Sequence, residues 1–324
     1  MIPLRDTQRS RSYPIVTHCI IAVNVMVYIF ETAQGQDLDL FLYIYGLVPA
    51  RYSVPHIAAY FTIGQQVFSL FSFMFLHGGF WHLLGNMWSL YIFGDNIEDR
   101  LGPFRYLPFY LLCGLASGLT HLVFNLESNI PTIGASGAVA GIMGAYFILY
   151  PRSKILTLIP IIIIPYFLEI PAFFFLGIWL FFQLLNAAGS TGGAGGIAWW
   201  AHIGGFVFGI VLLKLLDRIP ASGFTAKIRG ATTKRKSHRL QVIHPVVRDD
   251  EPHLYATIHI SPFEAQTGAQ KLINIPWGFH NRLFRVLVPP GIQAGSRLRL
   301  QGLGRQLPGG RDKGDLFLTV VIQP

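Results

Sequence analysis

Three short stretches of the sequence place polar side chains suited to acyl transfer inside otherwise apolar segments. Ser136 lies in IGASGAVAGIMG and His202 lies in AHIGGFVFG, and a serine hydroxyl beside a histidine imidazole is the nucleophile and base pair of acyl transfer. The third stretch, HGGFWHLLGN, carries His82 and Asn86 four positions apart, on one face of a helix. We therefore predict a Ser136–His202 dyad, with His82, Asn86 and the backbone N–H of Ser136 as donors to the oxyanion.

Ser136 also has a structural interpretation, because serine is favoured at the start of a helix and small residues allow close packing of helices in lipid. Four glycines support such packing, two after Ser136 and two on the helical stripe of His202: Gly137, Gly141, Gly205 and Gly209. The two interpretations are compatible, since close approach of these helices is what brings His202 towards Ser136. The glycine pattern is a condition for the dyad.

Other catalytic classes fit the sequence less well. A zinc protease of the H-E-x-x-H type needs two histidines four apart with a glutamate between them, whereas His77 and His82 are five apart without one. An intramembrane aspartyl protease needs two aspartates within spans, and Asp95 stands alone. Cys19 and Cys113 lack C-x-x-C spacing, so neither a disulfide framework nor a thiolate zinc site is expected. We expect no metal and no cofactor.

Composition indicates a membrane protein in which helices position these groups. The 324 residues are 52% hydrophobic and 13% charged, whereas charged residues make up about a quarter of a typical soluble domain. Runs of about 20 apolar residues are long enough to cross a bilayer, and six are predicted: 14–31, 79–97, 104–125, 135–150, 170–187 and 198–216. The segment 154–171 contains three prolines, which exclude a continuous helix, and is assigned to no element.

Positively charged residues sort to one side of these spans. They gather before the first span, in the turns near Arg100 and Arg152, and after the sixth span. Because such residues mark cytoplasmic segments, both termini, including residues 1–13, are expected in the cytoplasm, with the three polar stretches near the opposite face. The expected localisation is the bacterial inner (plasma) membrane, as an integral multi-pass protein.

The net positive charge lies after the last span. Residues 221–324 carry fifteen Lys and Arg against six Asp and Glu, which accounts for the +9 of the whole chain. Since the basic stretch follows a hydrophobic span directly, we interpret it as a juxtamembrane segment attracted to anionic lipid and expect no nucleic acid as partner. A basic cytoplasmic linker over 218–247 then precedes short β-type segments, which predict a small soluble β-rich domain over 248–324.

In their order along the chain, the motifs H-G-x-x-x-H-x-x-x-N, G-x-S-G and A-H-x-x-G-x-x-x-G resemble those of the rhomboid intramembrane serine proteases. The resemblance covers the six spans and implies a membrane all-α fold, a six-helix rhomboid-like bundle over 14–217. It implies that Ser136 is the nucleophile and His202 the general base. His82 and Asn86 would line the oxyanion hole.

The same resemblance assigns structural roles and shows two departures. Gly205 and Gly209 would pack the sixth span on the fourth, and Glu98 would fasten the turn between the second and third helices. Many rhomboids carry a Trp-Arg pair where this chain reads Phe68-Ser69, and several place an aromatic residue at the position of Ala140, stacked on the catalytic histidine. The candidates for holding His202 instead are two neighbouring tryptophans: Trp199 and Trp200.

The tail resembles a second family. The segments LYATIHISPFEAQTGAQKLINIP, RVLVPPGIQAGSRLRLQGLG and GGRDKGDLFLTVVI are similar to the C-terminal β domain of DnaJ-type co-chaperones. The H-P-D motif and the C-x-x-C-x-G-x-G repeats of other DnaJ regions are absent from the sequence, so stimulation of a chaperone ATPase is not expected. The resemblance implies a peptide-binding or dimerising module, with a purely structural appendage as the alternative.

Taken together, the sequence predicts an intramembrane serine endopeptidase that cleaves transmembrane segments of other proteins. Its expected partners are transmembrane protein substrates, the lipid bilayer, and a peptide or a second copy at the C-terminal domain. A non-catalytic rhomboid-like adaptor that binds membrane proteins is the competing hypothesis. Inactive relatives typically lose the serine or the histidine, and this chain keeps both.

Overall fold

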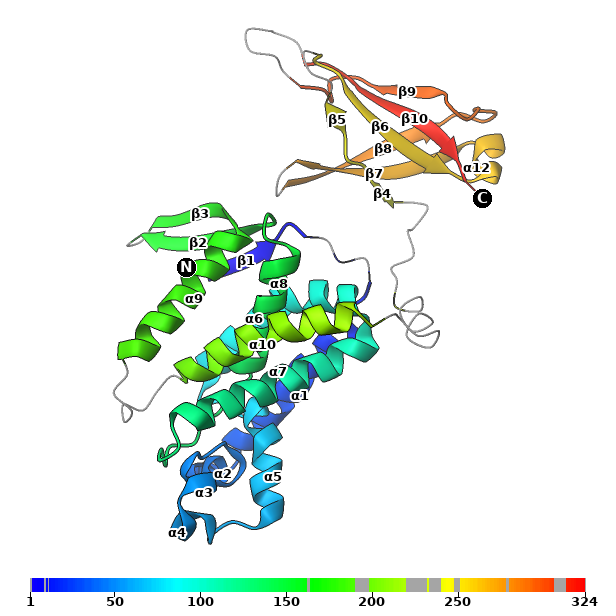
Figure 1. Cartoon of the computed structure of the whole chain (residues 1–324). Coiled ribbons are helices and arrows are strands. Elements are labelled where there is room, and N and C mark those ends of the chain that lie inside the picture. Colours follow the sequence, from blue (N-terminus) through cyan, green and yellow to red (C-terminus); the bar gives the residue numbers. More distant parts are fainter. Residues whose placement is uncertain are drawn as a thin grey trace. The chain divides into compact units, whose positions relative to one another are not determined.

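The computed structural model describes residues 2–8, 10, 12–161, 164–189, 198–219, 232, 240–247, 251–277, 280–305 and 313–323. They form two compact units, Met1–Lys234 and Arg235–Pro324. The first unit, blue to green in Figure 1, is a helical bundle with one small sheet, and the second, yellow to red, is built from two small sheets.

Six helices make the bundle: α1 (Ile15–Thr32), α6 (Phe80–Leu101), α7 (Pro103–Phe124), α8 (Ser136–Leu149), α9 (Ala172–Gly189) and α10 (Trp199–Asp217). Four of them, α1, α7, α9 and α10, are long and apolar enough to cross a membrane. α6 makes a fifth candidate span with the helix before it, from which it is bent by 77°. α8 is apolar but has 14 residues, about 21 Å of helix, which is less than the ~30 Å of a bilayer's hydrocarbon core.

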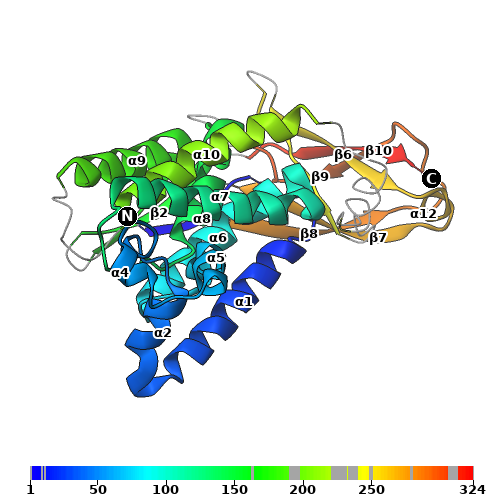
Figure 2. The ribbon, with the colours of Figure 1, turned by 60° about the horizontal axis from the view of Figure 1, so that its bottom comes forward.

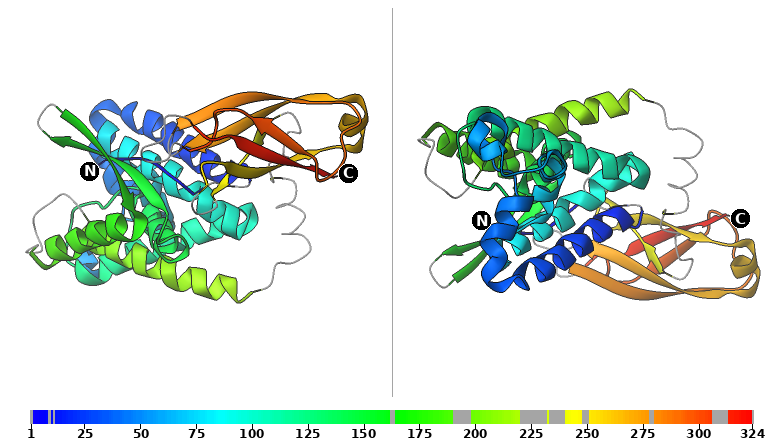
Figure 3. Two further views of the ribbon diagram at one scale, coloured as in Figure 1. Left: turned by 90° about the horizontal axis from the view of Figure 1, so that it is seen from above. Right: turned by 90° about the horizontal axis from the view of Figure 1, so that it is seen from below.

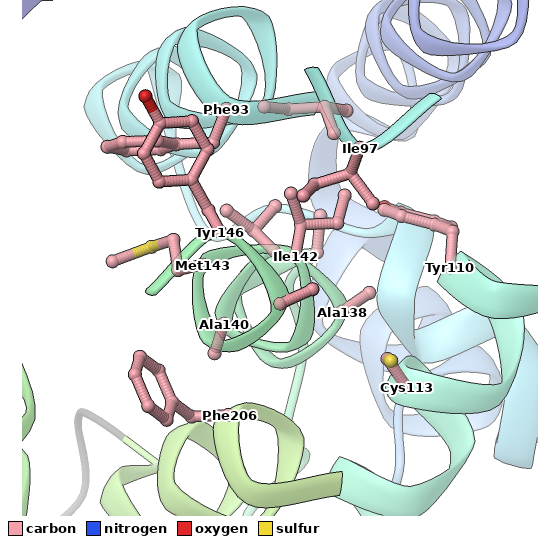
Figure 4. Close-up of a cluster of buried hydrophobic side chains, with 14 of the residues drawn as sticks. Phe93, Ile97, Tyr110, Cys113, Ala138, Ala140, Ile142, Met143, Tyr146 and Phe206 are labelled. Atoms are coloured by element: carbon pink, nitrogen blue, oxygen red, sulfur yellow. The ribbon is translucent and has the colours of Figure 1, made fainter. Parts of the chain in front are cut away.

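The short helix α8 is the centre of the bundle, with α6, α7, α9 and α10 against it (Figure 2). Every residue from Gly137 to Tyr146 is buried. Small side chains make this possible, because they let the neighbouring helices come close on all sides. Figure 4 shows the larger side chains that neighbouring helices direct towards α8: Phe93 and Ile97 from α6, Tyr110 and Cys113 from α7, and Phe206 from α10.

The long connection between α1 and α6 folds into short helices: η1 (Gly35–Asp37), α2 (Leu38–Tyr45), α3 (Ala50–Ser53), α4 (Pro55–Ala58), α5 (Ile63–Ser72) and η2 (Phe73–Phe75). A fully buried Arg51 holds it together. The guanidinium donates to the carbonyls of Ile44 (3.0 Å) and Tyr43 and lies 3.7 Å from the centre of the Phe61 ring. Arg51 thus fixes a connection that lacks the Trp-Arg pair of many rhomboids.

The proline-containing segment that the sequence left unassigned is a β-hairpin, β2 (Lys154–Ile161) and β3 (Ile164–Pro171). Isoleucine-rich segments favour strands, and the third strand of this sheet is β1 (Ile2–Asp6), which pairs antiparallel with β2. Residues 1–13, expected only as a cytoplasmic terminus, therefore contain a strand. Asp6 accepts hydrogen bonds from the hydroxyl of Tyr146 and the amide of Asn96, and burial raises the pKa of Asp6 to about 6.

The second unit has strand order β5-β6-β10-β9 in one sheet and β4-β7-β8 in the other. The strands are β4 (Leu240–Val242), β5 (Val246–Val247), β6 (Leu254–Ile260), β7 (Ala269–Trp277), β8 (His280–Val288), β9 (Arg297–Leu300) and β10 (Leu316–Ile322), with one short helix, α12 (Pro262–Thr267). β4 pairs with β7 and β5 pairs with β6. The β domain therefore begins within residues 218–247, the range predicted as linker. Most of the remaining linker lies outside the described residues.

Two ion pairs support this domain. Lys271, almost completely buried, lies 2.6 Å from Glu264. Burial raises the pKa of Glu264, but hydrogen bonds from Lys271 and Ser261 outweigh it, so the pKa lies below its usual value. The N–H of Gly302 and the guanidinium of Arg299 hydrogen-bond Asp315 and lower the pKa of that carboxyl.

Candidate active site

α8 starts at Ser136, two residues after a glycine that the site requires. Gly134 has φ +123°, and a Cβ there would lie 2.8 Å from two ring atoms of His82 and 3.6 Å from Ser136 Oγ. Its N–H donates to the carbonyl of Phe73 (2.9 Å), which holds the turn in place. The glycine therefore lets the His82 ring lie beside the serine hydroxyl, at the amino end of α8 where the helix dipole favours negative charge.

Ser136 and His202 are in direct contact. Ser136 Oγ and His202 Nε2 are 2.8 Å apart, which is the distance of a hydrogen bond between a nucleophile and its base. His202 lies in the first turn of α10, so the dyad joins the amino ends of two helices through residues that are 66 positions apart in sequence. Both side chains are half-buried.

A row of glycines brings α10 against α8. A Cβ at Gly205 would lie 2.1 Å from the carbonyl oxygen of Gly137, and a Cβ at Gly209 would lie 2.1 Å from that of Gly141. Real Cβ atoms essentially never come this close to a backbone oxygen. The backbones of the two helices therefore touch along two turns, and this contact carries His202 to Ser136.

The other ring nitrogen of His202 meets a residue that the sequence analysis did not select. His202 Nδ1 lies 2.7 Å from Oε1 of Gln183, which is buried on α9. The Trp179 ring lies 5.8 Å from the His202 ring. The sequence signal that could have indicated Gln183 is its position as a glutamine inside an apolar span, because a polar side chain in a span is a functional candidate.

Of the two tryptophans expected at His202, one is nearby and one is not. The Trp199 ring lies edge-on at 6.3 Å from the His202 ring. Trp200 instead stacks on Phe124 of α7 at 3.9 Å, because successive residues of a helix point about 100° apart. Trp179 on α9 is thus the aromatic neighbour that a sequence search around His202 misses.

The stretch from His77 to Asn86 supplies the remaining polar groups. His82 is exposed, and its ring packs edge-on against the ring of His77 at 5.2 Å. Asn86, one turn further along α6, is buried, and its Nδ2 has no hydrogen-bond partner among the described residues. Buried donors are normally paired, so an unpaired amide here suits a group that receives its acceptor from a substrate. The ring nitrogens of buried His77 are also without a partner in the described structure.

The carboxylate of Glu98, near the end of α6, contacts the start of α1. Its carboxylate accepts hydrogen bonds from the N–H groups of Val16 (2.9 Å) and Thr17 (2.8 Å) and from the Thr17 hydroxyl (2.8 Å). The first N–H groups of a helix lack partners within the helix, and the proline before α1 has no polar side chain to supply one. The Glu98 side chain therefore ties α6 to the start of α1. In the turn between α6 and α7, where the resemblance assigns Glu98, its backbone carbonyl accepts from the N–H of Gly102 at 2.7 Å.

The assembled groups can perform acyl transfer. A serine hydroxyl faces a histidine nitrogen, the histidine is held on its far side, and His82 lies beside the start of α8. His82 is exposed and the dyad is half-buried, and the dyad lies at the end of the bundle where α8 and α10 begin. Within the described ranges, no group of three or more His, Cys, Asp or Glu side chains is placed to hold a metal ion.

Comparison with known proteins identifies both parts of the chain. Residues 64–218 match the Rhomboid domain, and residues 238–324 match the DnaJ C terminal domain. These matches confirm both resemblances and the predicted order of a helical membrane region followed by a β-rich domain. The chain is a multi-pass membrane protein.

Several rhomboid proteins are similar to part of the chain. Rhomboid protein 1, mitochondrial, of Saccharomyces cerevisiae is 31% identical over 150 residues, which are 44% of this chain and 40% of that protein. RHOMBOID-like protein 6, mitochondrial, of Arabidopsis thaliana is 32% identical over 171 residues, 50% of this chain and 47% of that protein. Inactive RHOMBOID-like protein 8 of Arabidopsis thaliana is 32% identical over 84 residues, 26% of this chain and 23% of that protein.

The alignments span less than half the length of each of these relatives. The chain therefore contains a rhomboid domain, followed by a DnaJ C-terminal domain.

Proposed function

We propose that the chain is an intramembrane serine endopeptidase that cleaves transmembrane segments of membrane proteins. The observation that carries the proposal is the 2.8 Å contact between Ser136 Oγ and His202 Nε2 inside a rhomboid domain. Ser136 attacks the scissile carbonyl while His202 takes its proton. His202 then gives that proton to the leaving amine, and a water molecule, activated by the same histidine, releases the acyl group from Ser136.

The negative charge on the carbonyl oxygen develops next to the amino end of α8. We propose that the Ser136 N–H, His82 and the unpaired amide of Asn86 donate to it. In well-studied hydrolases one such donor contributes about 2.7–4 kcal/mol to the transition state. The reaction needs no metal and no cofactor.

The surroundings of the site support a membrane-embedded substrate. The dyad lies at one end of apolar helices, so a transmembrane segment reaches it at the edge of the bilayer. The charge distribution supports cytoplasmic termini and a site near the opposite face. The bacterial inner (plasma) membrane is the proposed location. The C-terminal domain would bind a peptide or a second copy of the chain and would affect which substrates are presented.

The test uses the full chain in proteoliposomes with a fluorogenic transmembrane substrate and a serine-reactive fluorophosphonate. Ser136→Ala and His202→Ala are expected to abolish cleavage and labelling. Ser89→Ala, at a half-buried serine on α6, is the matched control and should retain both. Cleavage by Ser136→Ala at the wild-type rate would disprove the mechanism. A wild type that neither cleaves nor reacts would favour a non-catalytic binding protein; one of the similar rhomboid proteins is itself named as inactive.

A further inference from the structure

Gln183 is a polar residue in an apolar turn of α9. Its neighbours in the helix read LGIWLFFQLLN, and its side chain is 6% exposed. Burying an amide without hydrogen bonds costs several kcal/mol. Here both ends of the amide are paired, so the side chain is held in one orientation.

The pairing fixes which end of the amide faces the dyad. Gln183 Nε2 donates to the carbonyl of Trp179, one turn earlier, at 3.3 Å. Oε1 is thereby directed to His202 Nδ1 at 2.7 Å. The opposite orientation would place the amide oxygen against the Trp179 carbonyl oxygen, where two acceptors repel each other.

The orientation of the amide in turn selects the tautomer of the histidine. An amide oxygen only accepts hydrogen bonds, and a neutral imidazole carries one N–H. The proton must therefore sit on Nδ1, which leaves the lone pair of Nε2 directed at Ser136 Oγ, 2.8 Å away. This is the tautomer that a general base requires.

We infer that Gln183 is a positioning residue of the dyad: it fixes the tautomer and ring orientation of His202 in the place where soluble serine hydrolases use a carboxylate. The inference rests on the proposed function. When His202 takes the serine proton, Oε1 keeps its hydrogen bond to the Nδ1–H of the imidazolium. The Trp179 ring, 5.8 Å from the His202 ring, limits the rotation of the imidazole from one side.

Two substitutions separate this role from simple packing. Gln183→Met keeps the length of the side chain and removes the acceptor, whereas Gln183→Glu keeps an oxygen at the same position. Replacing the orienting acceptor of a carboxylate triad costs about 10⁴ in kcat, and a neutral acceptor contributes less, so we expect Gln183→Met to lower kcat by roughly 10- to 100-fold with KM unchanged. Gln183→Glu should retain more activity than Gln183→Met, with lower thermal stability because its second carboxylate oxygen faces the Trp179 carbonyl. Asn186→Leu, at an exposed asparagine of the same helix, is the control.

A second measurement reads the tautomer without turnover. Nitrogen-15 NMR of the histidine-labelled chain, with His202 assigned by difference from His202→Ala, should show an Nδ1–H imidazole in the wild type and a tautomer mixture in Gln183→Met. Unchanged kcat and tautomer in Gln183→Met would overturn the inference. So would a loss of activity in Gln183→Glu as large as that in Gln183→Met. Failure of the proposed function is recognised separately, because the wild type would then neither cleave nor label at Ser136.

A different feature, the hairpin of β2 and β3, carries a second inference. It contains no charged residue from Ile155 to Leu168, and Lys154 and Glu169 form an ion pair of 2.9 Å at its base. Tyr166 and Phe167 are 52% and 56% exposed. Successive strand residues point to opposite faces, so both faces of this part of the hairpin are apolar and open.

We propose that this hairpin lies in the interfacial layer of the bilayer, at the end of the bundle opposite the dyad. β3 ends at Pro171 and α9 begins at Ala172, so the base of the hairpin is fixed at the start of a membrane span. In the views of Figures 1 and 3 the hairpin crosses the ends of the helices and extends past them. β3 is an edge strand of its sheet, and its free backbone groups need water or lipid headgroups, which excludes the hydrocarbon core. Aromatic residues are enriched in that interface.

Phe167→Cys in a Cys19→Ser background tests the position, since the remaining Cys113 is buried. The full chain is labelled with nitrobenzoxadiazole and reconstituted in vesicles whose lipids carry a spin label either at the headgroup region or deep in the acyl chain. We expect stronger quenching by the shallow label than by the deep one. Quenching by neither lipid would overturn the proposal; protection from aqueous iodide would then indicate a protein partner, and access to iodide a hairpin in water.

Discussion

Gly205→Ala tests whether close approach of α8 and α10 holds the dyad together. A Cβ at Gly205 would lie 2.1 Å from the carbonyl oxygen of Gly137 and 2.9 Å from its carbonyl carbon. Carbon and oxygen atoms that are not bonded normally stay about 3.3–3.5 Å apart. The carbonyl belongs to the backbone of α8 and cannot rotate away, so α10 must move away from α8 by about 1 Å.

This displacement acts on the bond between Ser136 Oγ and His202 Nε2, which is 2.8 Å long. A further separation of about 1 Å takes the two atoms beyond hydrogen-bond distance, and a misplacement of that size costs roughly 100-fold in rate. Overpacking of a close-packed interior costs about 1–3 kcal/mol. We therefore expect Gly205→Ala to lower kcat about 100-fold and the free energy of unfolding by about 1–3 kcal/mol.

The assay measures cleavage of a transmembrane substrate, fluorophosphonate labelling of Ser136 and thermal unfolding in the same proteoliposomes or detergent. Gly177→Ala on α9 is the matched control, because nothing lies within 4 Å of its added Cβ. Alanine forms helices better than glycine by up to about 1 kcal/mol, so the control should be neutral or slightly stabilising. Wild-type kcat and labelling in Gly205→Ala would refute the reasoning, as would an equal loss of activity in Gly177→Ala.

Three further outcomes follow from the structure. Glu98→Ala leaves the first N–H groups of α1 unpaired and should lower the free energy of unfolding by about 1–3 kcal/mol, measured by thermal unfolding, while any folded protein still labels at Ser136. Burial raises the pKa of Asp6 from 3.8 to about 6, so pairing of β1 with β2 should be strongest below pH 4 and should weaken as the pH rises through 6. Hydrogen exchange of the β1 amides, corrected for intrinsic rates, should show this pH dependence, and Asp6→Asn should remove it. Deletion of 235–324, one compact unit, should leave the rate of fluorophosphonate labelling at Ser136 unchanged. It should alter substrate choice, measured by substrate profiling, or oligomeric state, measured by cross-linking.

The helices and the dyad could be predicted because their signals are local. Apolar runs mark the spans, and polar residues such as Ser136 and His202 stand out where lipid makes polarity costly. The glycine spacing around them indicated which helices come close, and the structure places Gly205 against Gly137 and Gly209 against Gly141. Each of these signals is contained in a single continuous segment of the sequence.

The features that the sequence did not reveal depend on partners far along the chain. β2 needs β1, which lies about 150 residues earlier, so the prolines excluded a helix but could not indicate a strand. The Glu98 carboxylate binds the start of α1, 81 and 82 residues away, and no spacing within α6 indicates this contact. Gln183 reaches His202 only because α9 packs against α10, a contact that no spacing within α9 indicates.

The identity of the residue behind His202 follows from the medium in which it works. A carboxylate would hold the same tautomer and stabilise the imidazolium more strongly, but an acidic residue within a span costs about 2.5–3.5 kcal/mol when it is inserted into the membrane. An amide whose two ends are bonded to Trp179 and His202 carries no net charge and leaves no group unpaired. It fixes the tautomer at a small desolvation cost and gives up part of the charge stabilisation. A neutral third member is therefore compatible with a dyad embedded among apolar helices, and it predicts chemistry that depends on orientation of the base more than on its electrostatic activation.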